Sequence, residues 1–224
     1  MNLLLVEDDE GYATTLAEEL RALDHEVTVA PNGAIALQIA DREPFDAAII
    51  DRMLPQMDGT AVLRRLRESG KMLPVVMLSA LGRSNEKVEG LDAGADDYVV
   101  KPTPAAELDA RLKALMRGRQ WTHGASDTVR AGDITVSPAR FRAWRNDRPL
   151  DLVRLELQLL AELVRNAGTV LTRAMLIERV WGYDFEPTTN IVDVQIRALR
   201  RKLTADGEDD PIVTLRGIGY MLRD

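Results

Sequence analysis

The sequence predicts an α/β fold in two parts: an N-terminal doubly wound (βα)5 parallel sheet and a smaller C-terminal α+β domain. Three observations support this prediction. The chain has 224 residues, which is more than a single domain usually contains. Short apolar runs alternate with amphipathic stretches over residues 1–117. Beyond this point the alternation ends and the segments become shorter, which indicates that a different domain begins.

The first part contains five short apolar runs with the composition of buried strands, each followed by a segment with helical periodicity. The expected strands are 3–6, 27–30, 47–50, 75–78 and 98–100. The expected helices are 11–23, 33–42, 60–68, 83–93 and 104–117. Because each strand is followed by a helix, the strands should be parallel, with right-handed crossovers and helices on both faces of the sheet.

Residues 118–127 (GRQWTHGASD) lose hydrophobic periodicity and predict a linker between domains at 1–117 and 128–224. After the linker, residues 128–152 contain short alternating segments of the kind that form small antiparallel strands. Three amphipathic helices and a hairpin are expected next, at 153–166, 172–181, 188–203 and 211–222. Three helices followed by a hairpin with a basic tip predict a winged helix-turn-helix domain.

Composition limits the chemistry that this chain can perform. It has no cysteine, which excludes disulfides, thiolate metal sites and thiol nucleophiles. It has only two histidines, which argues against a metal site built from several of them. No run of 18 apolar residues is present and the N-terminus is acidic, so we expect a cytoplasmic protein with no membrane partner. The net charge of −7 is uneven, with −9 on residues 1–116 and +2 on residues 117–224, and therefore does not exclude binding to nucleic acid.

Polar or charged residues follow four of the five predicted strands: Glu7 and Asp8, Asp51, Ser79 and Lys101. The carboxyl ends of parallel strands meet at one edge of a sheet, so these side chains should lie together. Clustered carboxylates repel one another unless a cation intervenes, and their hard oxygens suit Mg²⁺. With Mg²⁺ and Lys101 offsetting the charge of a phosphoryl group, Asp51 can act as a nucleophile and form an aspartyl phosphate.

Residues 1–117 resemble a response-regulator receiver domain. The motifs that carry the resemblance are LLLVEDDE, AIIDRMLPQMDG, MLSA and GADDYVVKP, in matching order and spacing. The resemblance implies a Mg²⁺ site formed by Glu7, Asp8, Asp51 and the backbone carbonyl of Met53. It also implies that Asp51 accepts a phosphoryl group from a sensor histidine kinase.

The same resemblance implies a switch beside the phosphoacceptor. Ser79 would hydrogen-bond the phosphoryl group, Lys101 would pair with it, and Tyr98 would turn inward behind Ser79. Thr103 departs from the family pattern, which usually has phenylalanine after the Lys–Pro pair. A tight Lys101–Pro102 turn, in the cis or the trans form, is expected at this place.

The resemblance also implies a symmetric dimer face with two salt bridges and an apolar patch. Its residues are Lys87 with Glu107, Asp97 with Arg111, and the apolar Val88 and Leu91. Two positions depart from the family. Asp109 stands where an apolar side chain is usual. Gly118 stands where the family usually has an arginine that pairs with Asp96, so we expect Arg117 or Arg119 to take the place of that arginine.

The predicted helix 188–203 is amphipathic and basic, with a charge of +3 from residue 190 to residue 203. Taken alone, such a helix is equally typical of a solvated charged surface. Residues 128–224, however, resemble the C-terminal effector domain of the OmpR/PhoB family. The carrying motifs are RPLDLVRLELQLLAEL, VLTRAMLIERVWG, NIVDVQIRALRRKL and VTLRGIGYML.

This second resemblance implies the residues that contact DNA. They are Gln195, Arg197 and Arg200 near the major groove, Arg201 and Lys202 at phosphates, and Arg216 at the minor groove. Ala198 departs from the family, where a long polar residue is common, so a base contact would be absent or moved to Arg197. The loop 182–187 resembles a segment that touches RNA polymerase, and it can also be a connection anchored by Trp181 and Tyr183.

Together the resemblances imply a phosphorylation-controlled, DNA-binding transcription regulator of a two-component system. The implied partners are a sensor histidine kinase, double-stranded promoter DNA, RNA polymerase and a second copy of the chain, because activation would strengthen a homodimer. The implied cofactor is Mg²⁺.

Two other functions remain open. The first is an aspartyl-phosphate phosphatase, since haloacid-dehalogenase-type enzymes also begin from an aspartate and Mg²⁺. Those enzymes carry a second aspartate two residues later as a general acid, whereas this chain has Met53. We therefore expect only slow self-dephosphorylation at Asp51 and no other enzymatic activity. The second is a constitutive DNA-binding regulator whose receiver is degenerate and not phosphorylated.

Overall fold

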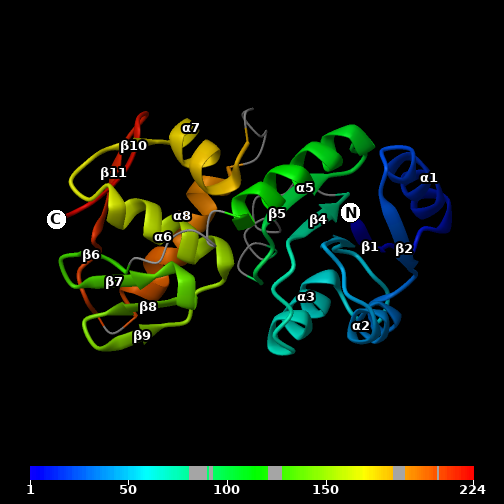
Figure 1. Ribbon diagram of the computed structural model, residues 1–224, viewed down its shortest axis with the longest axis horizontal. Helices are drawn as coiled ribbons and strands as arrows, with labels where there is room; N and C mark the ends of the chain where they lie inside the picture. The colour runs from blue at the N-terminus through cyan, green and yellow to red at the C-terminus, as the bar shows by residue number, and fades with distance from the viewer. Residues whose placement is uncertain (81–89, 91–92, 121–127, 184–189, 206) are drawn as a thin grey trace. The chain divides into compact units, whose positions relative to one another are not determined.

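A computed structural model describes residues 1–80, 90, 93–120, 128–183, 190–205 and 207–224, without the side chains of residues 118–120 (Figure 1). The chain forms two compact units, residues 1–113 and 114–224, which we describe separately. Among the helices in these ranges, none is both long and apolar enough to cross a membrane.

The N-terminal unit is built on a parallel sheet of five strands in the order β2-β1-β3-β4-β5. The strands are β1 (Asn2–Val6), β2 (Glu26–Ala30), β3 (Ala47–Asp51), β4 (Val75–Ser79) and β5 (Asp97–Val100). The predicted sheet is therefore confirmed. Strand order reverses between β1 and β3, which places a ligand-binding edge beyond the carboxyl ends of these strands.

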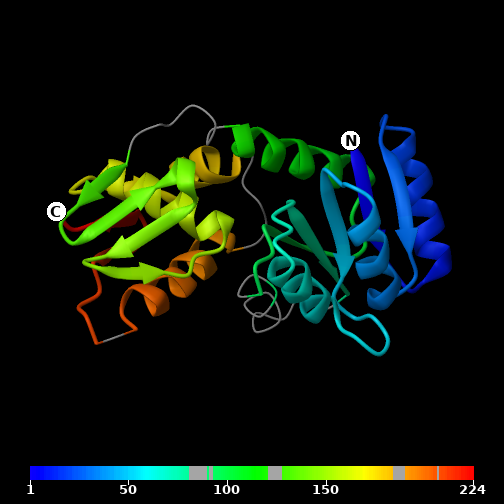
Figure 2. The same ribbon diagram turned by 60° about the horizontal axis from the view of Figure 1, so that its bottom comes forward.

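Helices α1 and α5 cover one face of this sheet, and α2 and α3 cover the other (Figures 1 and 2). They span Glu10–Arg21, Ala105–Gln120, Gly33–Arg42 and Gly59–Glu68 respectively. The side chains of Asp9, Asn32 and Asp58 cap α1, α2 and α3 by accepting a backbone N–H bond. Helix α5 runs three residues further than predicted, and most of the predicted helix 83–93 lies outside the described residues.

The C-terminal unit begins with an antiparallel sheet in the order β6-β7-β8-β9. These strands are Val129–Ala131, Ile134–Ser137, Arg142–Arg145 and Arg148–Leu150, with the 3₁₀ turn η2 (Pro138–Arg140) before β8. Helix α6 (Arg154–Arg165) packs against β6 and β7 and also contacts α8 (Ile191–Leu203). Between them, α7 (Arg173–Leu176) continues into a π-helical turn, η3 (Ile177–Trp181).

The hairpin at the end of the chain is confirmed as β11 (Ile212–Leu215) and β12 (Gly219–Leu222). A third strand, β10 (Leu171–Thr172), pairs antiparallel with β12 and was not predicted, because two residues are too short to show an alternating pattern. Three helices, the sheet and this wing together form the winged helix-turn-helix domain that the sequence predicts.

Two arginines of the β6–β9 sheet hold the C-terminal end of α8. The guanidinium of Arg145 donates to the carbonyl of Leu203 at 3.0 Å. Arg148 donates to the carbonyls of Lys202 at 3.2 Å and Leu203 at 2.9 Å. Positive charge at a helix C-terminus satisfies its last carbonyls and interacts favourably with the helix dipole. The orientation of α8 is therefore set by the sheet that precedes it.

Gly59, at the start of α3, generates the first prediction. A Cβ atom there would lie 2.1 Å from the backbone oxygen of Asp51, so Gly59→Ala must displace the loop that carries Asp51. We expect this variant to lose about 1–3 kcal/mol of unfolding free energy, measured by urea denaturation followed by circular dichroism. Gly11→Ala is the control, since its Cβ meets only Asp9 Oδ1 at 3.4 Å. Equal stability of both variants would contradict the prediction.

Candidate functional site

The predicted acidic cluster is present at the carboxyl edge of the parallel sheet. Glu7 follows β1 and Asp51 ends β3, and both are buried, whereas Asp8 is exposed. One ligand oxygen from each of these carboxylates lies within 4.8 Å of the others. The amide N–H of Met53 donates to Asp51 Oδ1 at 3.1 Å and fixes the orientation of that carboxylate. The strands thus bring together residues that are 44 positions apart.

Lys101 joins two of these carboxylates. Its Nζ donates to Asp51 Oδ2 at 2.7 Å and also to Glu7 Oε2. Burial by itself would lower the pKa of Lys101, but these hydrogen bonds raise that pKa above its ordinary value. The amine is therefore an ammonium group at neutral pH, placed where an incoming phosphoryl group would need positive charge.

The donor set of this cluster fits Mg²⁺. Burial raises the pKa of Glu7 above its ordinary value, and the charge of Asp51 adds to this rise while the hydrogen bond from Lys101 opposes it. The cluster therefore gains from further positive charge. Carboxylate oxygens, one of them exposed and open to water, are the ligands that Mg²⁺ prefers. The side chain of Met53 is 59% exposed beside the cluster.

Ser79 lies on β4, which pairs with the strand that ends in Asp51, and Tyr98 lies on β5, on the other side of β4. Ser79 ends β4, is fully buried, and its carbonyl accepts from the backbone N–H of Lys101 at 2.8 Å. Tyr98 is fully buried as well, opposite Met77 in the sheet. A Cβ at Gly90 would lie 3.3 Å from its ring, so glycine leaves room for the aromatic side chain. Tyr98 therefore occupies an inward position.

Three residues of the predicted dimer face pair within one chain. Arg111 donates to Asp97 Oδ2 at 2.7 Å and to Glu107 Oε1 at 2.6 Å. Arg111 and Asp97 are 2% and 0% exposed and pair within the chain, and the predicted bridge to a second copy stays a prediction. Lys87, Val88 and Leu91 lie outside the described residues.

The unusual Asp109 has partners in its own domain. Its carboxylate contacts buried His25 Nε2 at 2.8 Å and Lys113 Nζ at 2.8 Å. Burial would raise the pKa of Asp109, but the bonds from Lys113 and His25 hold it below its usual range. The charge is thereby stabilised where the family usually has an apolar residue.

Asp96 also has a partner that sequence reasoning missed. Its carboxylate accepts from the backbone N–H of Val75 at 2.7 Å and from Arg67 at 3.2 Å. Arg67 lies 29 residues away at the end of α3, so no local pattern pointed to it. The prediction that Arg117 or Arg119 replaces the family arginine stays a prediction, because the side chain of Arg119 is not described.

On α8 and the wing, three of the predicted DNA-binding arginines are exposed: Arg197, Arg201 and Arg216. Gln195 differs, because it is 0% exposed and its amide atoms have no hydrogen-bond partner in the described part of the chain. It lies one turn from Ile191 and Leu199, on the face of the helix that packs inward. The prediction that Gln195 contacts DNA is therefore corrected.

Arg200 and Lys202 are engaged inside the domain. Arg200 donates to the carbonyl of Ile212 at 2.6 Å and to Thr214 Oγ1 at 2.8 Å, which ties α8 to the wing. Lys202 donates to Glu156 Oε2 at 2.6 Å, which ties α8 to α6. Whether these two side chains also contact DNA stays a prediction. Ala198 is buried, and the absence of a base contact there, or its move to Arg197, stays a prediction.

A second cluster, Arg173–Asp193–Tyr220, joins α7, α8 and β12 and was not found from sequence. The Tyr220 hydroxyl donates to Asp193, and Arg173 Nη2 donates to the same carboxylate at 2.7 Å. Burial and the bond to Asp193 raise the pKa of Tyr220 to about 12. The three residues are far apart in the sequence, and no periodic pattern connects them.

The segment before α8 is anchored by two buried aromatic residues, as expected of a connection between helices. Trp181 is fully buried and Tyr183 is 2% exposed. Residues 184–187 of the loop lie outside the described part, so contact with RNA polymerase stays a prediction.

Two protein families match separate parts of the chain. Residues 3–113 match the response regulator receiver domain, and residues 147–222 match the family described as transcriptional regulatory protein, C terminal. The response regulator MprA of Mycobacterium leprae is 40% identical over 225 residues, covering 100% of this chain and 99% of that protein. The transcriptional regulatory protein PrrA of Mycobacterium tuberculosis is 44% identical over 222 residues, covering 99% and 95%.

One solved structure, of a mutant of RitR, covers 100% of this chain and 99% of its own, with a TM-score of 0.79 at 30% identity. The likeness therefore extends over both parts of the chain.

Tyr220 generates the second prediction. Its phenol ordinarily ionises near pH 10, and at about pH 12 in the folded chain. Between these values only the unfolded state loses the proton, so the stabilisation from this group is complete below about pH 10 and is lost towards about pH 12. The unfolding free energy of the natural chain minus that of Tyr220→Phe should fall over this window. A difference that stays constant from about pH 8 to about pH 12 would refute it.

Proposed function

The chain belongs to the response regulator family, as a transcriptional regulatory protein of the OmpR/PhoB type, and we propose that phosphoryl transfer to Asp51 controls its binding to DNA. The observation that carries this proposal is the placement of the Lys101 ammonium against Asp51 at the switch point of the sheet. The donor of the phosphoryl group is a phosphohistidine of a sensor kinase. The domains are a receiver at 1–117, a linker at 118–127 and a DNA-binding domain at 128–224.

In the transfer step, a carboxylate oxygen of Asp51 attacks phosphorus, forming a P–O bond as the P–N bond to histidine breaks. The imidazole nitrogen keeps the electron pair of the broken bond and leaves as a neutral ring after taking up a proton. Lys101, which lies 2.7 Å from Asp51, turns its ammonium to a phosphoryl oxygen. Glu7, Asp8, Asp51 and the Met53 carbonyl would hold Mg²⁺, which would supply further positive charge when bound.

Ser79 hydrogen-bonds the transferred phosphoryl group, and the inward position of Tyr98 belongs to the active arrangement. In the absence of a second acid at Met53, release of the phosphoryl group is limited to slow self-dephosphorylation. Activation strengthens a homodimer, and the two DNA-binding domains of that dimer engage two half-sites with a high effective concentration.

DNA binding in this proposal depends on the exposed arginines of α8 and the wing. Arg197 and Arg201 face the major groove and its phosphates, and Arg216 reaches the minor groove. Arg200 and Lys202 act instead by holding α8 against the wing and α6. The loop 182–187 touches RNA polymerase.

A second candidate function is a constitutive regulator whose receiver serves only for assembly. The observations that favour it are the two departures from the family pattern in the receiver, at Thr103 and at Asp109. The two candidates differ in whether Asp51 is needed for regulation.

The third prediction concerns this difference. Light scattering on the full chain with Mg²⁺ should give a molar mass near 24.9 kDa, and beryllofluoride, which mimics a phosphoryl group, should shift it towards twice that value. Asp51→Ala should abolish the shift, because it removes the oxygen to which beryllofluoride binds. A dimer that forms equally in the natural chain and in Asp51→Ala would favour the constitutive regulator.

The fourth prediction concerns the arginines that face DNA. Arg197→Ala and Arg216→Ala should each weaken promoter binding by about 1–3 kcal/mol if the side chain reaches a base edge, and should lower the salt slope by about 1 if it reaches a phosphate. Arg142→Ala is the matched control, because it removes an exposed arginine of the same domain away from α8 and the wing. Fluorescence anisotropy at several salt concentrations measures both effects. Equal losses in all three variants would indicate a general charge effect.

A further inference from the structure

We infer that Tyr12 is a positioning residue for phosphoryl transfer, whose aromatic ring holds the Lys101 ammonium against Asp51. The inference rests on the proposed function and names a residue outside the motifs from which that function was derived. Tyr12 lies in the first turn of α1, and its backbone N–H donates to the capping Asp9 Oδ1 at 2.9 Å. The ring therefore starts from a fixed point on the backbone.

The geometry around the ammonium leaves one side for the ring. A lysine ammonium has three N–H donors, and two of its partners are Asp51 and Glu7. Nζ also lies over the Tyr12 ring, 4.7 Å from its centroid, within the range of a cation–π interaction. The negative face of the ring thus lies beside the ammonium together with the two carboxylates.

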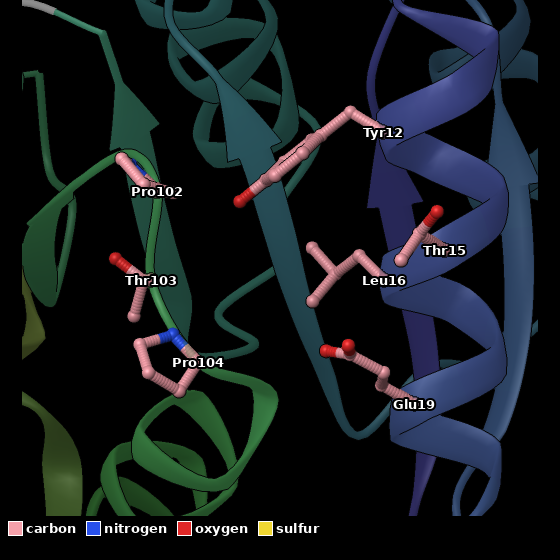
Figure 3. Close-up of a pocket in the computed structure, with 7 residues that line it drawn as sticks. All are labelled: Tyr12, Thr15, Leu16, Glu19, Pro102, Thr103 and Pro104. Atoms are coloured by element: carbon pink, nitrogen blue, oxygen red, sulfur yellow. The ribbon is translucent and has the colours of Figure 1, made fainter.

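The Tyr12 ring also lines a cavity between α1 and the segment that follows β5 (Figure 3). Tyr12 and Leu16 from α1 line a cavity of about 300 Å³ together with Pro102, Thr103 and Pro104 (Figure 3). The hydroxyl end of Tyr12 points towards the segment that follows Lys101 (Figure 3). Thr103 donates to the carbonyl of Val100 at 2.6 Å, which holds that segment close to β5. The ring therefore stands beside a backbone that is fixed next to the lysine.

This arrangement matters because lysine has a flexible four-carbon stem and a strongly hydrated charge. An ammonium that turned out to water would be lost from the path of the incoming phosphoryl oxygen. By covering the third side of Nζ, the ring favours the orientation towards Asp51 before the donor arrives. Its effect should fall on the rate of transfer and not on the binding of the phosphodonor.

The test uses the full chain, Mg²⁺ and phosphoramidate. Its P–N bond breaks as Asp51 attacks phosphorus, and ammonia leaves with the electron pair of that bond. Intact-mass measurements give the rate of phosphorylation. We expect Tyr12→Leu to lower the maximal rate by roughly fivefold to tenfold, with a nearly unchanged half-saturating concentration of phosphoramidate, and Tyr12→Phe to restore the rate to within about twofold of the natural chain. In a Lys101→Met background, Tyr12→Leu should make no further difference.

A second readout does not depend on activity. In protein without Mg²⁺, the nuclear magnetic resonance signals of the Lys101 Hε protons should be shifted upfield by the ring in the natural chain and in Tyr12→Phe. Tyr12→Leu should return them to ordinary values. Circular dichroism of each variant establishes that it is folded.

Each outcome decides the matter. A folded Tyr12→Leu that is phosphorylated at the natural rate, or Hε signals that are equal in all variants, would overturn the role of Tyr12 and leave the proposed function standing. If the natural chain gains no phosphoryl group at Asp51, as judged against Asp51→Ala, the proposed function fails and the role of Tyr12 fails with it.

Discussion

One ammonium group holds the receiver site together. Glu7 and Asp51 are both buried at the edge of the sheet, where two negative charges would repel each other and would lack water. Lys101 lies between them and donates to both. Much of the surrounding structure serves this arrangement, because the strand order brings three strand ends to one edge and Gly59 lets the loop after β3 pass close to Asp51. A charge constraint and a packing constraint therefore act on the same residues.

Most of the receiver could be predicted from sequence because its signals are local. A buried strand ends in a polar residue, and strand ends converge in any parallel sheet, so Asp51 and Lys101 could be assigned to one site. Side-chain orientation on α8 could not be assigned in this way. Gln195 is polar but lies on the inner face of that helix, and Lys202 is drawn to Glu156 on α6. Helical periodicity identifies a buried face, whereas partners from other elements decide how polar residues at its border are used.

The family departures have the same explanation. Asp109 stands in place of an apolar residue, and burying its carboxylate without partners would cost free energy. His25 and Lys113 both contact this carboxylate. Asp96 pairs with Arg67, which comes from a different helix. In each case a change at one position is matched by a residue that is distant in sequence. Such compensation is visible only when the chain is folded, and it permits a domain to keep its architecture while its charged pairs change.

The clamp of Arg145 and Arg148 on the end of α8 has a practical consequence for anyone exchanging effector domains between regulators. The family match to the C-terminal part begins at residue 147, so it leaves out Arg145 and the strands β6, β7 and β8. A chimaera joined at that boundary would transplant α8 without half of the clamp that aims it. The smallest transferable module is therefore the whole of residues 128–224, because the β6–β9 sheet is part of the structure that orients α8.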